Sequence, residues 1–446
     1  MGMLTPKLGV VVTALPLYGL GSEAAPQLFE KSISNLSKLK LEIVPADEVV
    51  TDEEKSRKAA MKFREKEVDL ICLIAGTWTP DTFLIEMLNE IDTPFIIWAI
   101  PDTLSFDRYP TLSLCGTQLL CSTLKEFDRE YRFFYGEVSN DEILEEIYSF
   151  SKAVALRNRL KRSKICMVGY RPWVMAGLSF DEVELKRRLG PSLIHLGLDD
   201  FLKVREEISD EDTQKVWSTV KEKVGKVLSD ESECLLSIKS YLALRKIVDE
   251  KEADALTVEC EPKLKGKVCL ANSLLNDEGI PAACESDVNS AVAMLILHLL
   301  SGKPVLNGDI IGVFEKDNSM VFSHCGAGPL SLAEDKSSII LDINREVNSG
   351  VSVFYTGKPG DVTIVNLVGR KGTYRMCILS GKAVKTELLY PGNPTKVRFS
   401  EMRVREIIET IAYKGFGHHW NLVHDNLIKE LTEYCSLVGI DYVLLR

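Results

Sequence analysis

Apolar runs alternate with amphipathic segments through the first third of the chain. The segments between the runs carry apolar residues at helical spacing. The runs are LGVVVTAL, LEIVPA, DLICLIAG and PFIIWAI. Strands that are buried on both faces and separated by helices predict a parallel sheet with helices on both sides. We therefore predict a doubly wound α/β domain at residues 1–160.

The same alternation restarts after the basic stretch 157–164 (RNRLKRSK). Strand patterns at KICMVGY, SLIHLGL and DALTVEC, with helix patterns around 210–227 and 232–251, predict a second doubly wound domain at residues 161–345. From Val351 onward, short alternating strands separated by Gly and Pro turns are typical of a small antiparallel barrel or sandwich. We assign residues 346–446 to this β-rich C-terminal domain, which also holds two helices and a Gly/His loop.

Three helix starts carry recognisable capping residues. Thr51–Glu54 and Ser179–Glu182 have the S/T-x-x-E pattern of a capping box. Ser286 precedes an apolar stripe at helical spacing, which ends at Gly302. We therefore expect Ser286 to cap a buried helix.

Composition and charge narrow the class of protein. The chain has 446 residues and a formal net charge of −11, which disfavours binding to nucleic acid or to an anionic membrane. Its 11 cysteines are scattered without a CxxC pair, as expected in a reducing compartment. No signal-peptide pattern opens the chain, and the longest apolar stretch, SAVAMLILHLL, is too short to cross a bilayer. These features predict a soluble cytoplasmic protein.

A glycine-rich segment after the first strand needs separate consideration. Gly19–Ala24 matches GxGxxA, the pattern of a dinucleotide-binding turn. That turn requires the first glycine to follow the strand closely. Pro16, Leu17 and Tyr18 intervene here, so we favour an ordinary glycine-rich loop and keep a dehydrogenase as a weak rival.

Five polar residues of the second half stand at strand or helix ends. Glu285 precedes the helix that follows Ser286, and Asp309 begins a strand; the other three are His324, His418 and His419, after a strand or in a glycine-rich loop. Taken singly, each of these residues is best interpreted as a helix cap, a turn residue or a hydrogen-bonded core residue. Together they occupy the places where an α/β sheet builds its site.

Carboxylates and an imidazole form a mixed oxygen and nitrogen donor set. Such a set suits Mn²⁺, with Mg²⁺ or Co²⁺ as alternatives. Structural zinc is disfavoured because the cysteines lack paired ligand spacing.

Several longer segments resemble one enzyme family. They are LGVVVTALPLYG, GTWTPDTF, ACESDVNSAVAMLILHLLSGKPVLNGDIIGVF, VFSHCGAGP and GHHWNLV. In this order they resemble the L-fucose/L-arabinose isomerase superfamily over nearly the whole chain. The resemblance implies that Glu285, Asp309 and His419 bind a divalent metal, usually Mn²⁺. It also implies that His324 contacts metal or substrate. Trp78 matches an aromatic position that, in the fucose branch, enters the active site of a neighbouring subunit, which implies a homo-oligomer, trimer or hexamer, with sites at subunit interfaces.

The chemistry of that family fits these residue types. Converting an aldose to a ketose moves a proton between C1 and C2 through a cis-enediol. A metal ion can stabilise the enediolate as a Lewis acid, and two carboxylates can remove and return the proton. Glu285 and Asp309 would move the proton, while His324, His418 and Trp78 would bind the sugar. We expect an aldose–ketose isomerase acting on a pentose, a 6-deoxyhexose or a related sugar. The alternative is a non-catalytic sugar-binding or regulatory protein of the same fold.

Overall fold

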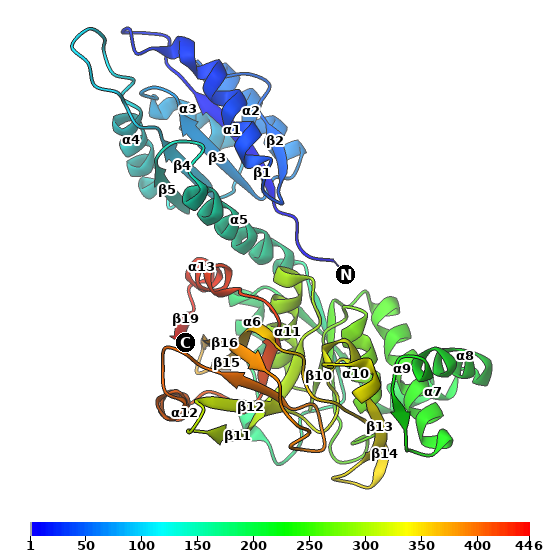
Figure 1. Cartoon of the computed structure of the whole chain (residues 1–446). Helices are drawn as coiled ribbons and strands as arrows, with labels where there is room; N and C mark the ends of the chain where they lie inside the picture. Colours follow the sequence, from blue (N-terminus) through cyan, green and yellow to red (C-terminus); the bar gives the residue numbers. More distant parts are fainter. Residues whose placement is uncertain (1) are drawn as a thin grey trace. The chain divides into compact units, whose positions relative to one another are not determined.

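The computed structural model describes residues 2–446, and their contacts divide them into two compact units. One unit comprises residues 4–158, and the other comprises residues 2–3 with 159–446. Figure 1 traces the chain through both units, coloured from the N-terminus to the C-terminus. We call them the N-terminal unit and the C-terminal unit.

The N-terminal unit is a five-stranded parallel sheet with the order β2-β1-β3-β4-β5. Its strands are β1 (Lys7–Thr13), β2 (Glu42–Pro45), β3 (Leu70–Ala75), β4 (Phe95–Ala99) and β5 (Tyr131–Tyr135). Its helices are α1 (Ala25–Leu36), α2 (Glu53–Glu65), α3 (Asp81–Glu90), α4 (Ser113–Glu126) and α5 (Asp141–Lys161), the last of which continues past the unit boundary. The strand order reverses direction at β1, as in a doubly wound sheet, and confirms the predicted α/β class.

The C-terminal unit begins with a second parallel sheet, in the order β10-β9-β6-β7. The strands are β6 (Lys164–Val168), β7 (Ser192–Leu196), β9 (Ala255–Val258) and β10 (Ala282–Cys284). The helices are α6 (Glu182–Arg188), α7 (Leu198–Glu206), α8 (Asp210–Lys221), α9 (Glu231–Lys251), α10 (Cys269–Asp277) and α11 (Val288–Ser301). A small sheet of β8 (Lys226–Val227), β13 (Ile340–Asn344) and β14 (Ser349–Phe354) lies in the same unit.

A ring of antiparallel strands forms the rest of the C-terminal unit. Its members are β11 (Leu306–Phe314), β12 (Ser319–Ser323), β15 (Gly360–Arg370), β16 (Thr373–Val384), β17 (Thr395–Arg398) and β18 (Trp420–Val423). They pair in the order β15-β18-β11-β12-β17-β16, and the pairing of β15 with β16 closes the ring. Strand β19 (Asp441–Leu445) adds to β16 in parallel, and helices α12 (Val404–Lys414) and α13 (Ile428–Val438) complete the unit.

Helix α11 joins the two parts of this unit. All of its residues are buried, and it packs against β6, β9 and β10 of the parallel sheet and against β11, β15 and β18 of the ring. One hydrophobic core extends from Cys166 to Leu445. The boundary predicted between residues 345 and 346 therefore falls inside one compact unit, because strands from both sides of it share a ring and a core.

The structure differs from the sequence prediction at several element ends. The expected caps Thr51 and Ser179 are replaced by the aspartates at 52 and 181, each of which accepts a hydrogen bond from a backbone N–H in the first turn of its helix. Strand β16 runs unbroken from Thr373 to Val384 and is longer than the short strands expected from Val351 onward, because it pairs with β15 along its length and with β17 at its end. Strands β5 and β18 are absent from the prediction. Within residues 2–446, no helix combines the length and apolar character needed to span a membrane.

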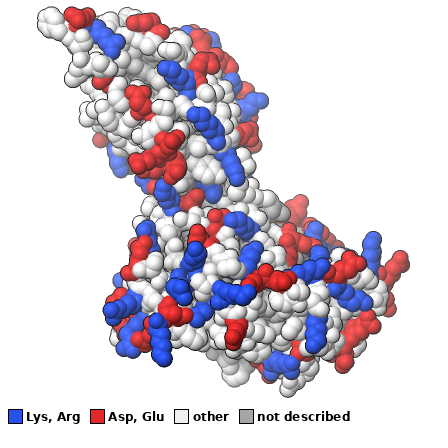
Figure 2. Space-filling view, viewed as in Figure 1, with Lys and Arg blue, Asp and Glu red and all other residues white. Residues whose placement is uncertain are grey.

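Charged side chains of both signs are interspersed on the face of the molecule shown in Figure 2. Exposed ion pairs of the protein include Arg405–Glu315 at 2.8 Å and Lys58–Glu54 at 2.7 Å. Exposed pairs of this kind contribute about 1 kcal/mol or less each, so the fold depends chiefly on its buried core.

Candidate metal and sugar site

Four segments of the C-terminal unit bring polar side chains to one place. They are the turn between β10 and α11, strand β11, the loop after β12 and the loop before β18. Strands β12, β11 and β18 are neighbours in the ring, and α11 packs against β11 and β18. The side chains gathered there are Glu285, Asp309, His324, His418 and His419.

The turn that carries Glu285 has an unusual backbone. Glu285 has φ 62° and Ser286 has φ 49°, both in the left-handed region, which costs a residue with a side chain about 1–2 kcal/mol. Two hydrogen bonds from Ser286 hold the turn: its N–H donates to the Val258 carbonyl at 3.1 Å, and its hydroxyl donates to the Val168 carbonyl at 3.2 Å. The turn is thereby attached to the carboxyl ends of β6 and β9, the edge at which parallel sheets build their sites.

Asp287 links the start of α11 to the histidine pair. Its Oδ1 accepts a hydrogen bond from the Ser290 N–H at 3.1 Å, so Asp287 caps the helix, and the prediction of Ser286 as the cap is wrong. Asp287 Oδ2 lies 2.8 Å from His419 Nδ1. Because a carboxylate only accepts, we assign the Nδ1 proton to this bond, and His419 Nε2 then faces the site. Asp287 was not among the residues predicted from the sequence, although its spacing of three from Ser290 is that of a helix cap.

The remaining distances define a compact group of ligand atoms. Glu285 Oε2 lies 3.4 Å from His419 Nε2 and 3.8 Å from His418 Nε2. His324 Nε2 lies 4.0 Å from Glu285 Oε1 and 3.9 Å from Asp309 Oδ2. Two three-residue sets have their ligand atoms within 4.8 Å of one another: Glu285 with His418 and His419, and Asp309 with His324 and His419.

The electrostatics of the group favour charged side chains. Burial alone would raise the pKa of Glu285, but the imidazoles of His418 and His419, whose Nε2 atoms lie 3.8 Å and 3.4 Å from Glu285 Oε2, hold that pKa well below its usual range. Burial would lower the pKa of His419, but Asp287 and Glu285 outweigh it and raise that pKa to about 10. Without a cation His419 is therefore an imidazolium at neutral pH, and a metal ion that binds Nε2 must displace a proton.

Three buried atoms of this group lack a hydrogen bond among the described residues. They are Glu285 Oε2, Asp309 Oδ1 and His419 Nε2. Buried polar atoms are normally paired, because leaving one unpaired costs about 1–3 kcal/mol. Two carboxylate oxygens and one imidazole nitrogen are suitable donors for a divalent cation such as Mn²⁺. The residues present therefore fit a metal site.

The site is open on one side. The His418 side chain is 49% exposed and that of Asp309 is 31% exposed, whereas Glu285, His324 and His419 are buried. A small polar ligand can therefore approach along His418 and Asp309.

Two other sequence candidates lie in the N-terminal unit. Trp78 follows β3 in a loop, is partly buried, and donates its backbone N–H to the Thr111 carbonyl at 2.7 Å. Residues 14–24 separate β1 from α1, and both Gly19 and Gly21 have positive φ angles of 67° and 74°. The long interval before the helix differs from the close turn that a dinucleotide site requires.

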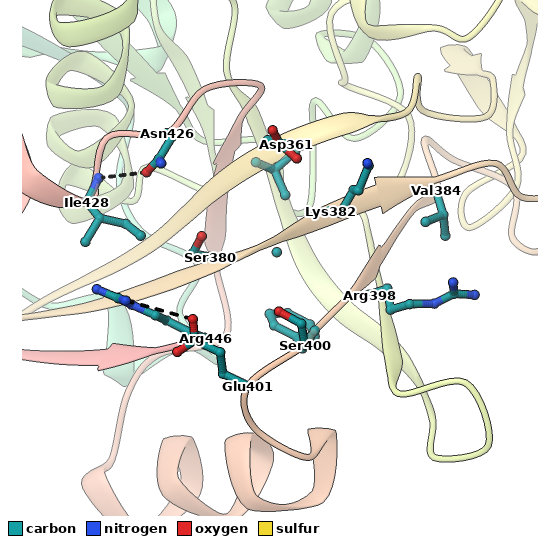
Figure 3. Close-up of a pocket in the computed structure, with 13 residues that line it drawn as sticks. Asp361, Ser380, Lys382, Val384, Arg398, Ser400, Glu401, Asn426, Ile428 and Arg446 are labelled. Atoms are coloured by element: carbon teal, nitrogen blue, oxygen red, sulfur yellow. Dashed lines mark hydrogen bonds and ion pairs between the residues drawn. The ribbon is translucent and has the colours of Figure 1, made fainter.

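A separate cavity of about 500 Å³ lies over β15, β16 and β17 (Figure 3). Asp361, Lys382, Arg398 and Glu401 contribute to its lining, and Glu401 pairs with Arg446 at 3.9 Å. None of the predicted site residues lines it, so we do not connect it with the chemistry of the metal site.

Comparison with known proteins shows which enzymes this chain is similar to. The profile described as "Fucose/sulfoquinovose isomerase, N-terminal domain" matches residues 22–161. A sulfoquinovose isomerase of Priestia aryabhattai is 23% identical over 90% of this chain and 90% of its own length. These matches support the resemblance to the L-fucose/L-arabinose isomerase superfamily.

Two further relatives are similar to this chain over most of its length. A sulfoquinovose isomerase of Alkalicoccus urumqiensis is 24% identical over 84% of this chain and 86% of its own length. An L-arabinose isomerase of Lactiplantibacillus plantarum is 20% identical over 72% of this chain and 73% of its own. The family profile ends at residue 161, so it includes Trp78 but none of the five clustered side chains. The roles of those five side chains in this chain stay predictions.

Proposed function

We propose that this protein is a divalent-metal-dependent aldose–ketose isomerase. Relatives named as sugar isomerases support the reaction class. The observation that carries the metal site is the pair of ligand groups that share His419: Glu285 with His418 and His419, and Asp309 with His324 and His419, the ligand atoms of each group lying within 4.8 Å of one another. Glu285, Asp309 and His419 would hold the cation, Mn²⁺ being the expected one, with Mg²⁺ or Co²⁺ as alternatives.

When bound there, the cation supplies a Lewis acid for the sugar oxygens next to the reacting carbons. Glu285 is held ionised by the neighbouring histidines, so its carboxylate can accept the proton from carbon. Asp309 belongs to a different segment and is the more exposed of the two carboxylates. We assign it the return of the proton to the neighbouring carbon. His324 lies between them, with Nε2 about equally far from both.

The sugar would be bound by residues at the open side of the site. His418 is half exposed beside Glu285, and its ring centroid lies 4.1 Å from that of His419. Asn366 fixes this loop by donating from Nδ2 to the Gly417 carbonyl at 3.1 Å. We propose that His418 and His324 bind sugar hydroxyls.

Assembly into a homo-oligomer, trimer or hexamer, is proposed from the resemblance, with Trp78 reaching the site of a neighbouring subunit. Exposed apolar side chains in the loops after β1 and β4 support an interface on the N-terminal unit. They are Leu17, Tyr18, Leu104, Phe106 and Tyr109. Light scattering coupled to gel filtration measures the subunit number directly, and a monomer would contradict this part of the proposal.

The substrate class is an aldose of the pentose or 6-deoxyhexose type. The relatives act, by name, on sulfoquinovose, which is a 6-deoxyhexose bearing a sulfonate, and on L-arabinose. The test is a panel of L-fucose, L-arabinose, sulfoquinovose and their ketoses with Mn²⁺, analysed by sugar chromatography, with an EDTA-treated control. Conversion that EDTA abolishes and Mn²⁺ restores is expected. Turnover that persists without metal would refute metal dependence, and tight sugar binding without conversion would favour the non-catalytic alternative.

A further inference from the structure

Two buried cysteines lie near His324: Cys325 contacts its imidazole, and Cys269 contacts Cys325. The Sγ atom of Cys325 lies 3.2 Å from His324 Nδ1 and 3.9 Å from the Sγ atom of Cys269. Cys269 and Cys325 form a small buried cluster with Cys284 and Ala327. Cys269 begins α10, whereas Cys325 lies in the loop after β12, so the two thiols come from separate segments that meet at the site.

We propose that Cys269 and Cys325 form a redox modification site: a dithiol that hydrogen peroxide converts to a disulfide, disabling the adjoining metal site through His324. The disulfide itself is inferred from the thiol geometry alone. Its effect on activity rests on the proposed function.

The oxidation is balanced with peroxide as the only oxidant. The Cys325 sulfur, 6% exposed against 2% for Cys269, attacks a peroxide oxygen; the O–O bond breaks, leaving a sulfenic acid and one water. The Cys269 sulfur then displaces the sulfenic oxygen, which leaves as a second water with the remaining thiol proton. Two thiols lose two electrons in total, and one peroxide is reduced to two waters.

Formation of the bond must move the Cys325 side chain, whose Sγ atom contacts His324 Nδ1. A disulfide has an S–S length of about 2.05 Å, so the two sulfurs must approach by about 1.9 Å from their present separation of 3.9 Å. The Cys325 carbonyl is held by Asn344 Nδ2 at 3.1 Å and by the Ser352 hydroxyl at 2.8 Å. Because this anchor resists movement of the whole loop, the adjustment falls on the Cys325 side chain and on His324. His324 Nε2 then moves relative to both carboxylates.

The reaction is expected to be slow. The hydrogen bond with Cys325 and burial raise the pKa of Cys269 well above its usual value. For Cys325 that hydrogen bond lowers the pKa, but burial outweighs it. Both groups are therefore thiols at neutral pH, and thiols react with peroxide far more slowly than thiolates.

The test treats the Mn²⁺-loaded wild type with hydrogen peroxide and follows three quantities: non-reduced peptide maps by mass spectrometry, Mn²⁺ binding and isomerase activity. We expect a Cys269–Cys325 linkage, at least a tenfold loss of activity in the linked fraction, and recovery to within twofold after dithiothreitol. Oxidised protein without this linkage would overturn the modification site. Complete linkage with unchanged activity and Mn²⁺ binding would overturn its effect. If no sugar is converted at all, the peptide map and Mn²⁺ binding still test the dithiol separately from the isomerase proposal.

Two matched variants test whether inactivation by peroxide depends on the Cys269–Cys325 pair. Cys269→Ser leaves the thiol beside His324 in place, so we expect unchanged basal activity and inactivation by peroxide at least tenfold slower than wild type. Cys72→Ser, which removes a buried thiol from the N-terminal unit, should be inactivated like the wild type. Inactivation of Cys269→Ser at the wild-type rate would exclude the dithiol. Should Cys269→Ser fail to fold, the wild-type peptide map still decides.

Discussion

Asp287→Asn tests how the site holds its imidazole ligand. In the wild type, Asp287 Oδ2 accepts the Nδ1 proton of His419 at 2.8 Å and a second hydrogen bond from the Ser290 hydroxyl at 2.8 Å. An asparagine has one oxygen and one NH₂ group, so it cannot fill all of the acceptor roles of Oδ1 and Oδ2. If its oxygen keeps the cap on Ser290 N, its NH₂ group faces His419. The imidazole must then carry its proton on Nε2, the atom proposed to bind the cation.

The magnitude follows from the kind of bond that is lost. Hydrogen bonds to charged groups contribute about 1.5–3 kcal/mol. Loss of the carboxylate that orients a metal-binding histidine typically weakens metal binding about 10–100-fold, or about 1.4–2.7 kcal/mol. Asn and Asp are comparable helix caps, so the cost to α11 should be small. We therefore expect Asp287→Asn to weaken Mn²⁺ binding by about 10–100-fold and, through the lost bond to the charged His419, to lower the stability of the metal-free protein by about 1.5–3 kcal/mol.

Calorimetric Mn²⁺ titration of the wild type and Asp287→Asn measures the affinity, and urea unfolding without metal measures the stability. Asp52→Asn is the matched control, because Asp52 caps α2 in the N-terminal unit by accepting from the Lys55 N–H at 2.9 Å. It repeats the chemical change away from the site and should leave Mn²⁺ affinity unchanged. Mn²⁺ affinity of Asp287→Asn within twofold of wild type would refute the role assigned to the His419 hydrogen bond.

Three further outcomes are expected. Glu285→Gln cannot accept a proton from carbon, so kcat should fall by about 10²–10⁴ while the circular dichroism spectrum is kept; a variant within a few-fold of wild type would exclude Glu285 as the base. Mn²⁺ at about 100 times its Kd should stabilise the wild type by about 2.7 kcal/mol, measured as a higher Tm that EDTA reverses, and the gain should be smaller in Glu285→Gln. Burial lowers the pKa of His424, which donates from Nε2 to the Lys358 carbonyl at 2.8 Å. A histidine kept neutral in the folded state contributes stability above its unfolded pKa of about 6.5 and loses it as the pH falls below that value. Urea unfolding at about pH 7.5 and about pH 5.5 should show a larger loss for wild type than for His424→Gln, and equal losses would contradict this assignment.

The parallel sheets could be predicted from the sequence because their strands are apolar on both faces. Strands β1 and β3 are almost entirely buried, so a run of apolar letters is enough to identify them. Strand β5, YRFFY, lies at the sheet edge and buries only Phe134 fully, so it lacks such a run. Strand β18 is buried throughout but has four residues beside a Gly/His loop, and only its pairing with β11 and β15 makes it a strand. A local sequence pattern identifies a strand when its own residues are apolar enough to show that both faces are buried. Strands β5 and β18 lack such a pattern, and their strand conformation depends on pairing with neighbouring strands.

The residues of the candidate site could be named from the sequence, but the contacts between them could not. Resemblance to a family named the carboxylates and histidines, and the ring of strands accounts for their proximity. No local pattern could place Asp287 against His419, because 132 positions separate them and the contact exists only when α11 meets the loop before β18. The Cys269–Cys325 contact likewise joins two segments 56 positions apart. Contacts of this kind are properties of the packed structure, and sequence spacing does not determine them.

The cost of building the site argues that it is kept for binding a ligand. Glu285 and Ser286 both adopt left-handed backbone, and three polar atoms of the cluster are buried without hydrogen bonds among the described residues. The fold does not require these features: Asp287 caps α11 without help from Glu285, and β11 pairs with β12 through backbone groups whichever side chain stands at 309. The left-handed backbone and the unpaired Asp309 Oδ1 lower the stability of the metal-free protein, the unpaired atom by about 1–3 kcal/mol, whereas Glu285 Oε2 and His419 Nε2, 3.4 Å apart, offset part of their cost by attraction of opposite charges. A cation shared by Glu285, Asp309 and His419 would satisfy all three atoms at once, which turns the separate costs into one ligand-dependent gain.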